Sequence, residues 1–453
     1  MINSRKAKIV AKIADNKSDT AFLTPLFKAG VDVAWLNTAH QGEVEALEVI
    51  NRIRAAAPHV AIMIDTKGPE IRTKNVEKPI EVKAGDQVIF TGDTTFTGDN
   101  VIHVSYPNFH NEVPVGKSIL YDDASIETVV MEKLEKGLRC EVKSSGLIKN
   151  KKSLNIPDVH IALPSLTEKD KAFIRFCAKN DIDYIIHSFV RNKQDLLDIR
   201  DILKEFPSYG GKIISKIENR EGFDNLHEIL ENCEGLMVAR GDLGAEVLLE
   251  ELPFMQKKMV EAALEMGKYS IVATQALESM IKNPRPTRAE VTDVANAILD
   301  GSDGVSMSGE TAYGDYPVEA TTMMGRIMKY TESKLGELNH YSAFPKNSSP
   351  AAAIAHDILT EARAAQAKVI VLLTKDMEVV RMLSGYRPEQ LIIPVCTSAS
   401  DARELMLAYA VRPVVASKLD ASAVLEALKS SDIAHQKVIV VEQAGTKLEV
   451  KVK

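Results

Sequence analysis

The sequence of 453 residues contains few cysteines, no long apolar run and no block of one charge. Its four cysteines lie far apart and none forms a CxxC pair, which excludes a disulfide framework or a zinc ribbon. We therefore expect buried thiols in a reducing compartment. No apolar segment approaches the about 18 residues that a membrane-spanning helix requires, and basic residues interrupt the first apolar segment. We expect a cytoplasmic protein without a membrane partner.

Charges of the two signs nearly balance, since 56 Lys and Arg against 63 Asp and Glu give a formal net charge of −7. No Lys/Arg cluster indicates a surface for nucleic acid or anionic lipid, so the expected partners are small molecules. The apolar fraction of 45% excludes intrinsic disorder. In a chain of this length it predicts large buried cores in two or three domains.

Short, β-branched apolar segments alternate with helical stretches along much of the chain. Most are continuous apolar runs, as is typical of parallel strands buried on both faces. Two helix starts fit the capping-box pattern, at residues 165–168 and 287–290. Eight such units predict a TIM (β/α)8 barrel. The expected strands are residues 8–13, 31–36, 60–64, 184–189, 212–217, 235–239, 269–273 and 304–307.

Two regions differ from this pattern. Residues 69–154 contain short β-prone segments divided by Gly and Asp turn signals, which predicts a small β domain inserted in a barrel loop. After a polar stretch, a helix near 351–364 precedes three further strands, which predicts an open α/β domain. We expect a barrel from residues 1–68 and 155–340, an inserted domain from 69–154 and a C-terminal domain from 341–453.

Polar residues follow nearly all of the expected barrel strands, at the end where TIM barrels carry their active sites. One such residue alone is most often a solvated loop residue, but seven strand ends together predict a site. The residues are Asn37, Asp65, Thr66, Ser188, Lys216, Glu218, Arg240, Gly241, Asp242, Thr274, Gln275, Ser308 and Glu310.

Glu218 and Asp242 offer carboxylate oxygens from neighbouring strands, which suits Mg²⁺ completed by substrate oxygens and water. Lys216 precedes Glu218 by two residues, so both side chains point to the same side of an extended strand. A lysine there supplies fixed positive charge to a transferring phosphoryl group or an enolate. The structural alternative is an ion pair between Lys216 and Glu218.

Long, ordered segments of the chain resemble pyruvate kinases over almost its full length. They are residues 62–72 (IMIDTKGPEIR), 213–219 (IISKIEN), 235–246 (GLMVARGDLGAE), 273–275 (ATQ), and 283–290 (NPRPTRAE) through 308–311 (SGET). The resemblance implies a barrel with an inserted β-barrel lid and a C-terminal α/β domain. It also implies a cytoplasmic, homotetrameric enzyme of glycolysis that transfers the phosphoryl group of phosphoenolpyruvate to ADP, giving pyruvate and ATP.

The resemblance further implies a role for each matching residue. Lys216 would stabilise the transferring phosphoryl group, while Glu218 and Asp242 would bind Mg²⁺. The remaining matches are Thr274 with the Gly241 and Asp242 amides of the Arg240 loop for the substrate carboxylate, Arg72 for the phosphate, Ser308 for the proton relay, Asn37, Asp65 and Thr66 for K⁺, and Glu70 as the residue found in K⁺-dependent members.

Two residues after the second strand depart from the family pattern Arg-Leu-Asn-Phe-Ser-His. Trp35 replaces the arginine and can supply neither its charge nor its bidentate fork. If nothing replaces that contact, the transition state loses roughly 2 to 4 kcal/mol, or about 30- to 1000-fold in rate. Ala39 replaces a serine hydroxyl and leaves the K⁺ site one ligand short. Two alternatives therefore stay open: an impaired paralogue that binds phosphoenolpyruvate or a related carboxylate, and a Mg²⁺-dependent 2-oxo-acid lyase or decarboxylase.

The C-terminal domain departs from the family pattern as well. Thr374 is followed by Lys-Asp-Met-Glu instead of a Ser/Gly/Arg-rich sugar-phosphate loop. Two carboxylates there disfavour a sugar bisphosphate. We expect no activation by fructose 1,6-bisphosphate.

Overall fold

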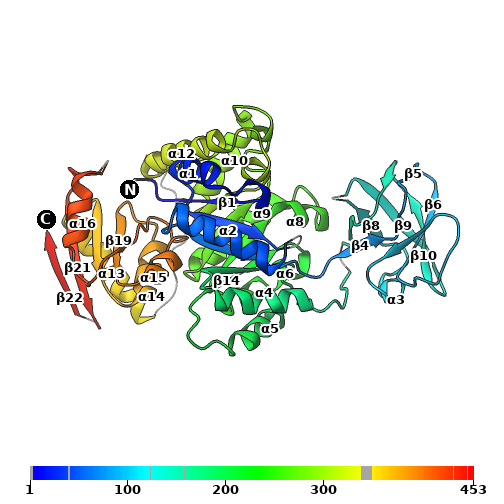
Figure 1. Ribbon diagram of the computed structural model, residues 1–453, viewed down its shortest axis with the longest axis horizontal. Helices are drawn as coiled ribbons and strands as arrows, with labels where there is room; N and C mark the ends of the chain where they lie inside the picture. The colour runs from blue at the N-terminus through cyan, green and yellow to red at the C-terminus, as the bar shows by residue number, and fades with distance from the viewer. Residues whose placement is uncertain are drawn as a thin grey trace.

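The computed structural model describes residues 4–38, 41–122, 124–157, 159–337, 349–431, 433–445 and 447–452. Figure 1 shows three parts in a row, with a large barrel in the middle, a small β barrel at one end and an α/β domain at the other. The predicted fold class is confirmed, while the residue limits given above for the domains stay predictions. Within the described ranges, no helix is long and apolar enough to cross a membrane.

The central barrel closes from eight parallel strands in the order β1-β17-β16-β15-β14-β13-β3-β2. All eight expected strands are present, with ends that differ from the predicted ones by at most two residues. Their bounds are β1 Lys8–Lys12, β2 Val33–Asn37, β3 Ala61–Asp65, β13 Tyr184–His187, β14 Lys212–Ile217, β15 Gly235–Ala239, β16 Tyr269–Ala273 and β17 Gly304–Met307.

Helices alternate with the strands of this barrel. They are α1 Thr20–Lys28, α2 Glu43–Ala56, α4 Glu168–Lys179, α5 Lys193–Leu203, α6 Arg220–Asp224, α7 Leu226–Glu231, α8 Arg240–Glu246, α9 Leu252–Glu265, α10 Arg288–Leu299, α11 Gly309–Ala312 and α12 Pro317–Lys334, with 3-10 turns at Asp15–Lys17, Glu278–Ile281 and Leu335–Glu337.

One of the two expected helix starts is confirmed and the other is shifted. Thr287 and Glu290 form the capping box of α10. At α4 the cap is Thr167 with Asp170, and the expected cap Ser165 donates its hydroxyl to Asp198 instead. Asp170 is fully buried and also accepts the Lys67 amide at 2.7 Å, so a contact with the end of β3 decides which Ser/Thr caps the helix.

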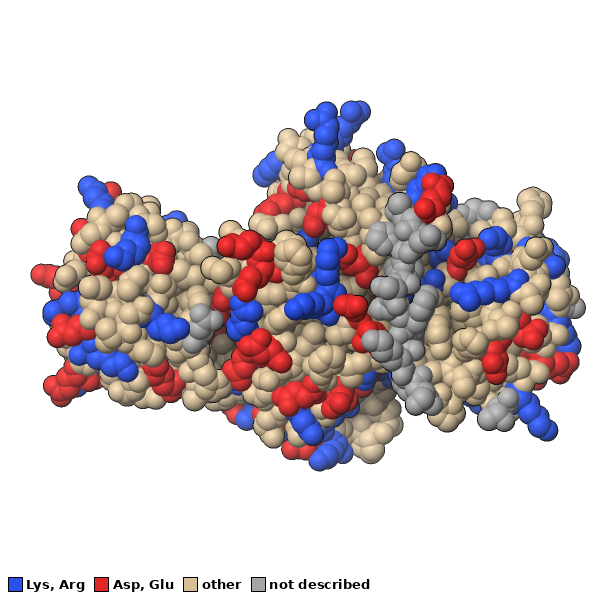
Figure 2. All heavy atoms as spheres, turned by 180° about the vertical axis from the view of Figure 1, so that it is seen from behind, with Lys and Arg blue, Asp and Glu red and all other residues tan. Residues whose placement is uncertain are grey.

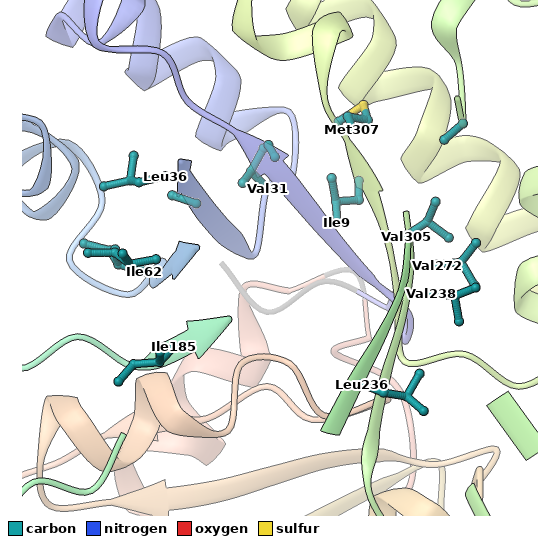
Figure 3. Close-up of a cluster of buried hydrophobic side chains, with 14 of the residues drawn as sticks. Ile9, Val31, Leu36, Ile62, Ile185, Leu236, Val238, Val272, Val305 and Met307 are labelled. Carbon is teal, nitrogen blue, oxygen red and sulfur yellow. The ribbon is translucent and has the colours of Figure 1, made fainter. Parts of the chain in front are cut away.

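Side chains alternate between the two faces of the barrel strands, as a pleated strand requires. Figure 3 shows residues such as Ile9, Leu36 and Ile62 on the face that packs against the helices. The residues between them, such as Val10 and Trp35, fill the interior of the barrel. The same alternation directs the polar residues at the carboxyl ends of the strands into the mouth of the barrel.

The inserted domain is a closed seven-stranded barrel in the order β10-β6-β7-β4-β12-β8-β9, which we call the lid. It follows β3, and Figure 1 shows it projecting from the end of the central barrel where that strand ends. Its elements are β4 Ile71–Lys74, β6 Gln87–Thr91, β7 Val101–Val104, α3 Phe109–Glu112, β8 Ser118–Tyr121, β9 Ile126–Leu134, β10 Gly137–Val142 and β12 Ser153–Asn155, with a separate pair, β5 Ile80–Val82 and β11 Gly146–Ile148.

The C-terminal domain has a five-stranded sheet in the order β20-β19-β18-β21-β22. The expected helix and three strands are present, but β20 and the antiparallel edge strand β22 were not predicted. The elements are α13 Pro350–Ala364, β18 Val369–Leu373, α14 Met377–Gly385, β19 Leu391–Cys396, α15 Ala399–Glu404, β20 Val414–Val415, α16 Ser422–Lys429, β21 Val438–Ala444 and β22 Lys447–Val452.

This domain covers the amino ends of the barrel strands. Tyr184, at the start of β13, donates its hydroxyl to the Glu404 carbonyl at 2.7 Å and accepts the Leu407 amide. The barrel interior and the core of the C-terminal domain thereby form one apolar cluster. On the face shown in Figure 2, acidic and basic side chains are interspersed over all three parts.

Candidate active site

Lys216 lies at the carboxyl end of β14 between two buried carboxylates. Its ammonium is 2.7 Å from Oε1 of Glu218 and 3.6 Å from Oδ2 of Asp65, which ends β3. The ion pair considered as a structural alternative is therefore present. It does not explain the whole arrangement, because a third carboxylate, Asp242, acts on the same two charges.

Backbone and hydroxyl donors hold both carboxylates in place. Glu218 accepts the Phe189 amide at 2.7 Å through its second oxygen. Asp65 accepts the Ser188 hydroxyl at 2.7 Å, and the Ser188 amide donates to Thr66 Oγ1 at 3.1 Å. The sequence segment after β13 thus positions the carboxylates that belong to β3 and β14.

The electrostatics of this cluster favour a cation. Burial alone lowers the pKa of Lys216, but Asp65 and Glu218 outweigh it and raise that pKa above the ordinary lysine value. Burial raises the pKa of Asp65, although Lys216 and the Ser188 hydroxyl oppose the shift. A buried carboxylate whose ionised form is disfavoured gains from an additional positive charge, so the cluster suits a bound cation.

The first turn of α8, directly after β15, is tied to the loop after β16 beside this cluster. Gly241 donates its amide to Thr274 Oγ1 at 2.9 Å. Thr274 and Gln275 adopt positive φ angles of 70° and 53°, a strained conformation for non-glycine residues that is typical of functional sites. The Arg240 guanidinium donates to the Ala273 carbonyl and to Asp293 at 2.6 Å. Arg240 therefore supports the loop, and its contact with substrate stays a prediction.

Ser308 lies directly after β17 and precedes α11. Its amide donates to Glu310 at 2.8 Å, and the other oxygen of Glu310 accepts the Leu277 amide at 2.9 Å. Glu310 is buried and joins the ends of two strands, which gives it a structural role. Thr311 donates its hydroxyl to the Lys12 carbonyl at 2.8 Å, so the end of β1 is held by the same short helix.

Among the described residues, Arg72 forms no ion pair or hydrogen bond with Lys216, Asp65, Glu218 or Asp242. It lies on β4 of the lid, where its guanidinium pairs with Glu70 at 2.7 Å and donates to the Lys151 carbonyl. A cleft of about 530 Å³ separates the base of the lid from the barrel, and its lining includes Glu70 and Asp242. The contact of Arg72 with a ligand stays a prediction.

The sequence did not predict that Lys12 and Trp35 lie together in the mouth of the barrel. The Lys12 ammonium lies 5.3 Å from the centroid of the Trp35 ring. The first strand was expected to run to Ile13, so Lys12 was taken as a strand residue rather than a strand end. The signal in the sequence was the charged residue Lys12 at the end of an apolar run. Ala39, expected to weaken the K⁺ site, lies outside the described residues.

The donor set fits a hard divalent cation. Carboxylate oxygens are the ligands that Mg²⁺ prefers, and Mg²⁺ usually keeps several waters and takes one or two protein carboxylates. Glu218 and Asp242 meet that requirement. In the part of the chain that is described, no group of three or more His, Cys, Asp or Glu residues could hold a metal alone, so substrate oxygens and water would complete the coordination.

Comparison with known proteins identifies the family of the chain. Residues 4–321 match the family model described as the pyruvate kinase barrel domain, and residues 352–452 match the pyruvate kinase alpha/beta domain. A pyruvate kinase of Borreliella burgdorferi is 43% identical over 410 residues, covering 90% of this chain and 86% of that protein. One from Geobacillus stearothermophilus is 40% identical over 452 residues, covering 96% and 77%.

A comparison with solved structures leads to the same family. The crystal structure of a pyruvate kinase from Cryptosporidium parvum superimposes with a TM-score of 0.91 at 36% sequence identity, covering 99% of this chain and 96% of that one. The family models and the relatives together span the barrel and the C-terminal domain. The chain belongs to the pyruvate kinase family.

Proposed function

We propose that this phosphotransferase moves the phosphoryl group of phosphoenolpyruvate to ADP, giving pyruvate and ATP in cytoplasmic glycolysis. The observation that carries the proposal is the Lys216 ammonium held between Asp65 and Glu218 in the mouth of the barrel. A binder without phosphoryl transfer has no evident need for a buried lysine fixed in that way. Membership of the family does not favour the impaired paralogue or the lyase alternative.

In this mechanism Glu218 and Asp242 would hold Mg²⁺, and the ion would supply positive charge to the bound substrate. Lys216 neutralises charge on the phosphoryl oxygens while the bond from phosphorus to the enol oxygen breaks and the bond to the ADP oxygen forms. The enolate keeps the electron pair and takes a proton at its terminal carbon. Ser308 is the expected member of the relay that delivers this proton.

The remaining contacts are proposed from the family pattern. Thr274 and the Asp242 amide receive the substrate carboxylate, together with the Gly241 amide of the Arg240 loop. The Gly241 amide donates to Thr274 Oγ1, so substrate would have to share or replace that bond. Arg72 reaches the phosphate when the lid closes, and lid closure excludes water from the reacting groups.

We also propose K⁺ as a second cation, with Asn37, Asp65 and Thr66 as ligands. Asn37 and Asp65 are paired in register at the ends of β2 and β3, so their oxygens belong to one edge of the barrel. Ala39 removes one ligand, and we expect altered K⁺ dependence. A homotetramer is the expected assembly. The apolar side chain of Val291 on α10 is 36% exposed and is therefore accessible to another subunit.

The test is formation of pyruvate from phosphoenolpyruvate and ADP with Mg²⁺, with and without K⁺. We expect turnover in the wild type. Absence of turnover that is recovered by Trp35→Arg/Ala39→Ser would select the impaired paralogue. Loss of CO2 from oxaloacetate without ADP would select the decarboxylase. Trp35 is the only tryptophan, so its emission reports substrate binding separately from turnover.

A further inference from the structure

The charge that Trp35 lacks is present on the neighbouring strand. Lys12 and Trp35 are register partners on β1 and β2, one position beyond the pair Ala11 and Ala34. Val10 and Val33 lie in the interior of the barrel, and strand alternation directs Lys12 and Trp35 into the same interior two residues later. Both side chains therefore enter the mouth of the barrel from adjacent strands.

The indole ring holds the lysine without neutralising it. The ammonium lies 5.3 Å from the ring centroid, within the range of a cation–π contact. Among the described residues, none forms an ion pair within 4.0 Å of the Lys12 ammonium or accepts a hydrogen bond from it. A ring face restricts the side chain but leaves its three N–H donors available to a ligand.

Trp35 adds a second unused donor. The side chain is 4% exposed, and its Nε1 has no hydrogen-bond acceptor within the described ranges of the chain. A buried indole N–H normally finds a partner, and leaving it without one costs free energy. Two donors on adjacent strands, one of them charged, are therefore without an acceptor among the described residues.

The position of this pair relates it to the reacting groups. Burial lowers the pKa of Lys12, the attraction of Asp65 opposes this shift and the repulsion of Lys216 adds to it. Lys216 itself lies 3.6 Å from Asp65. The Lys12 carbonyl is held by Thr311, which follows Ser308 on α11. Lys12, Asp65 and Lys216 thus face one space at the carboxyl ends of the strands.

We propose that Lys12 contacts the transferring phosphoryl group and supplies the positive charge that the family pattern places on an arginine at position 35, with Trp35 Nε1 donating a second hydrogen bond. Lys12 forms and breaks no covalent bond; it neutralises phosphoryl oxygens during transfer. This inference rests on the proposed function, because it assumes that phosphoryl transfer occurs at Lys216.

The experiment compares steady-state kinetics of the wild type with Lys12→Met, Lys12→Gln and Lys12→Met/Trp35→Arg. We expect Lys12→Met and Lys12→Gln to lower kcat/KM for phosphoenolpyruvate by roughly 30- to 1000-fold, and arginine at position 35 to restore at least about tenfold of that loss. The matched control is Lys169→Met, which removes another lysine over an aromatic ring, 5.7 Å from Phe173 on α4. It should leave kcat/KM unchanged.

Two further readouts separate the possible failures. Thermal unfolding by circular dichroism checks that both Lys12 variants fold, and Trp35 emission on titration with phosphoenolpyruvate and Mg²⁺ should shift less in them than in the wild type. Activity in the wild type, loss in Lys216→Met and kcat/KM within about threefold of wild type in both Lys12 variants would overturn the inference alone. Recovery of Lys12→Met by added K⁺ would also overturn it, because the ammonium would then replace a monovalent cation. A wild type without pyruvate formation would overturn the proposed function itself.

Discussion

The two ends of the central barrel both carry buried charges, but they use them differently. At the amino ends, three aspartates directly precede barrel strands, and each accepts a neighbouring strand amide and an arginine of the C-terminal domain. The pairs are Asp32 with Arg412 at 2.9 Å, Asp183 with Arg403 at 2.8 Å and Asp303 with Arg387 at 3.0 Å. Their strand amides belong to Ile9, Ile62 and Ser270.

At the carboxyl ends the charges are not matched in this way. Lys216 serves two carboxylates and is influenced by a third, while the donors of Lys12 and Trp35 lack acceptors among the described residues. Buried polar groups are normally satisfied, and unsatisfied ones concentrate at functional sites. The difference teaches that pairing of each charge indicates a structural interface, whereas surplus carboxylates and unused donors indicate a site for ligands.

We call the carboxyl ends of the barrel strands the open end and the amino ends, covered by the C-terminal domain, the closed end. The largest expected effect is at the open end. Lys216→Met should lower kcat by roughly 10³-fold or more, because the transferring phosphoryl loses its fixed positive charge. The matched variant at the closed end is Lys8→Met, which removes a buried lysine whose ammonium donates to the Val411 carbonyl. Rates of pyruvate formation measure both. A similar loss of kcat in a folded Lys8→Met enzyme would contradict the comparison.

Next in size is a pair of matched aspartate substitutions. Asp32→Asn should lower the free energy of unfolding by about 3 to 5 kcal/mol, because it leaves buried arginines without their carboxylate. Asp65→Asn should lower it by about 1 kcal/mol or less, because burial already disfavours the ionised form. Urea denaturation measures both changes. Equal destabilisation by the two substitutions would remove the distinction between the ends.

A smaller effect concerns the pH dependence of unfolding. Burial opposes ionisation of Asp32, but Arg412 and Arg5 outweigh it and lower its pKa. Its contribution is therefore present above about pH 4, the unfolded value, and is lost as the pH falls through the folded pKa. Asp65 has a raised pKa, so its contribution to stability decreases as the pH rises above about 4.

Urea denaturation between about pH 3 and pH 7 of Asp32→Asn, Asp65→Asn and the wild type tests these signs. Asp32→Asn should remove a part of the stability that rises with pH, and Asp65→Asn a part that falls with pH. If the two substitutions change the slope in the same direction, the electrostatic contrast between the two aspartates is wrong.

The smallest expected effect extends the comparison to the C-terminal domain. Asp376 caps α14, and its carboxylate accepts the amides of Glu378 and Val379 at 3.0 and 3.4 Å. These backbone donors already have a carboxylate acceptor, like the strand amides at the closed end of the barrel, so they are not available to a sugar phosphate. Fructose 1,6-bisphosphate should therefore leave the dependence of rate on phosphoenolpyruvate unchanged, and a clear shift of that curve would contradict the prediction.

Much of the fold could be predicted because strands buried on both faces leave a continuous apolar run. Strands without that signature were missed: β20 has two residues, and β22 alternates charged and apolar residues at an exposed edge. The α4 cap was misplaced because two Ser/Thr residues fit the same local pattern and a tertiary contact of Asp170 chose between them.

The candidate site divides in the same way. Lys216 and Glu218 could be placed on one side of a strand because their spacing of two residues is a local property. The contact of Lys216 with Asp65 joins strands far apart in the chain, and no spacing predicts it. The attachment of Arg240 to Asp293 is equally non-local, and it directs that guanidinium into support of a loop.

The order of apolar runs, turns and polar strand ends by itself determined that this chain forms a barrel with an inserted β domain and a reactive mouth. That information is local, because hydrophobic periodicity acts over a few residues. Only the tertiary structure decided which charges are matched and which donors remain available. Closing the sheet places Lys12 of the first strand beside Trp35 of the second. It also brings Lys12 within electrostatic range of Lys216, which lies on the opposite side of the barrel on the fifth strand. Neither relation follows from distance along the sequence.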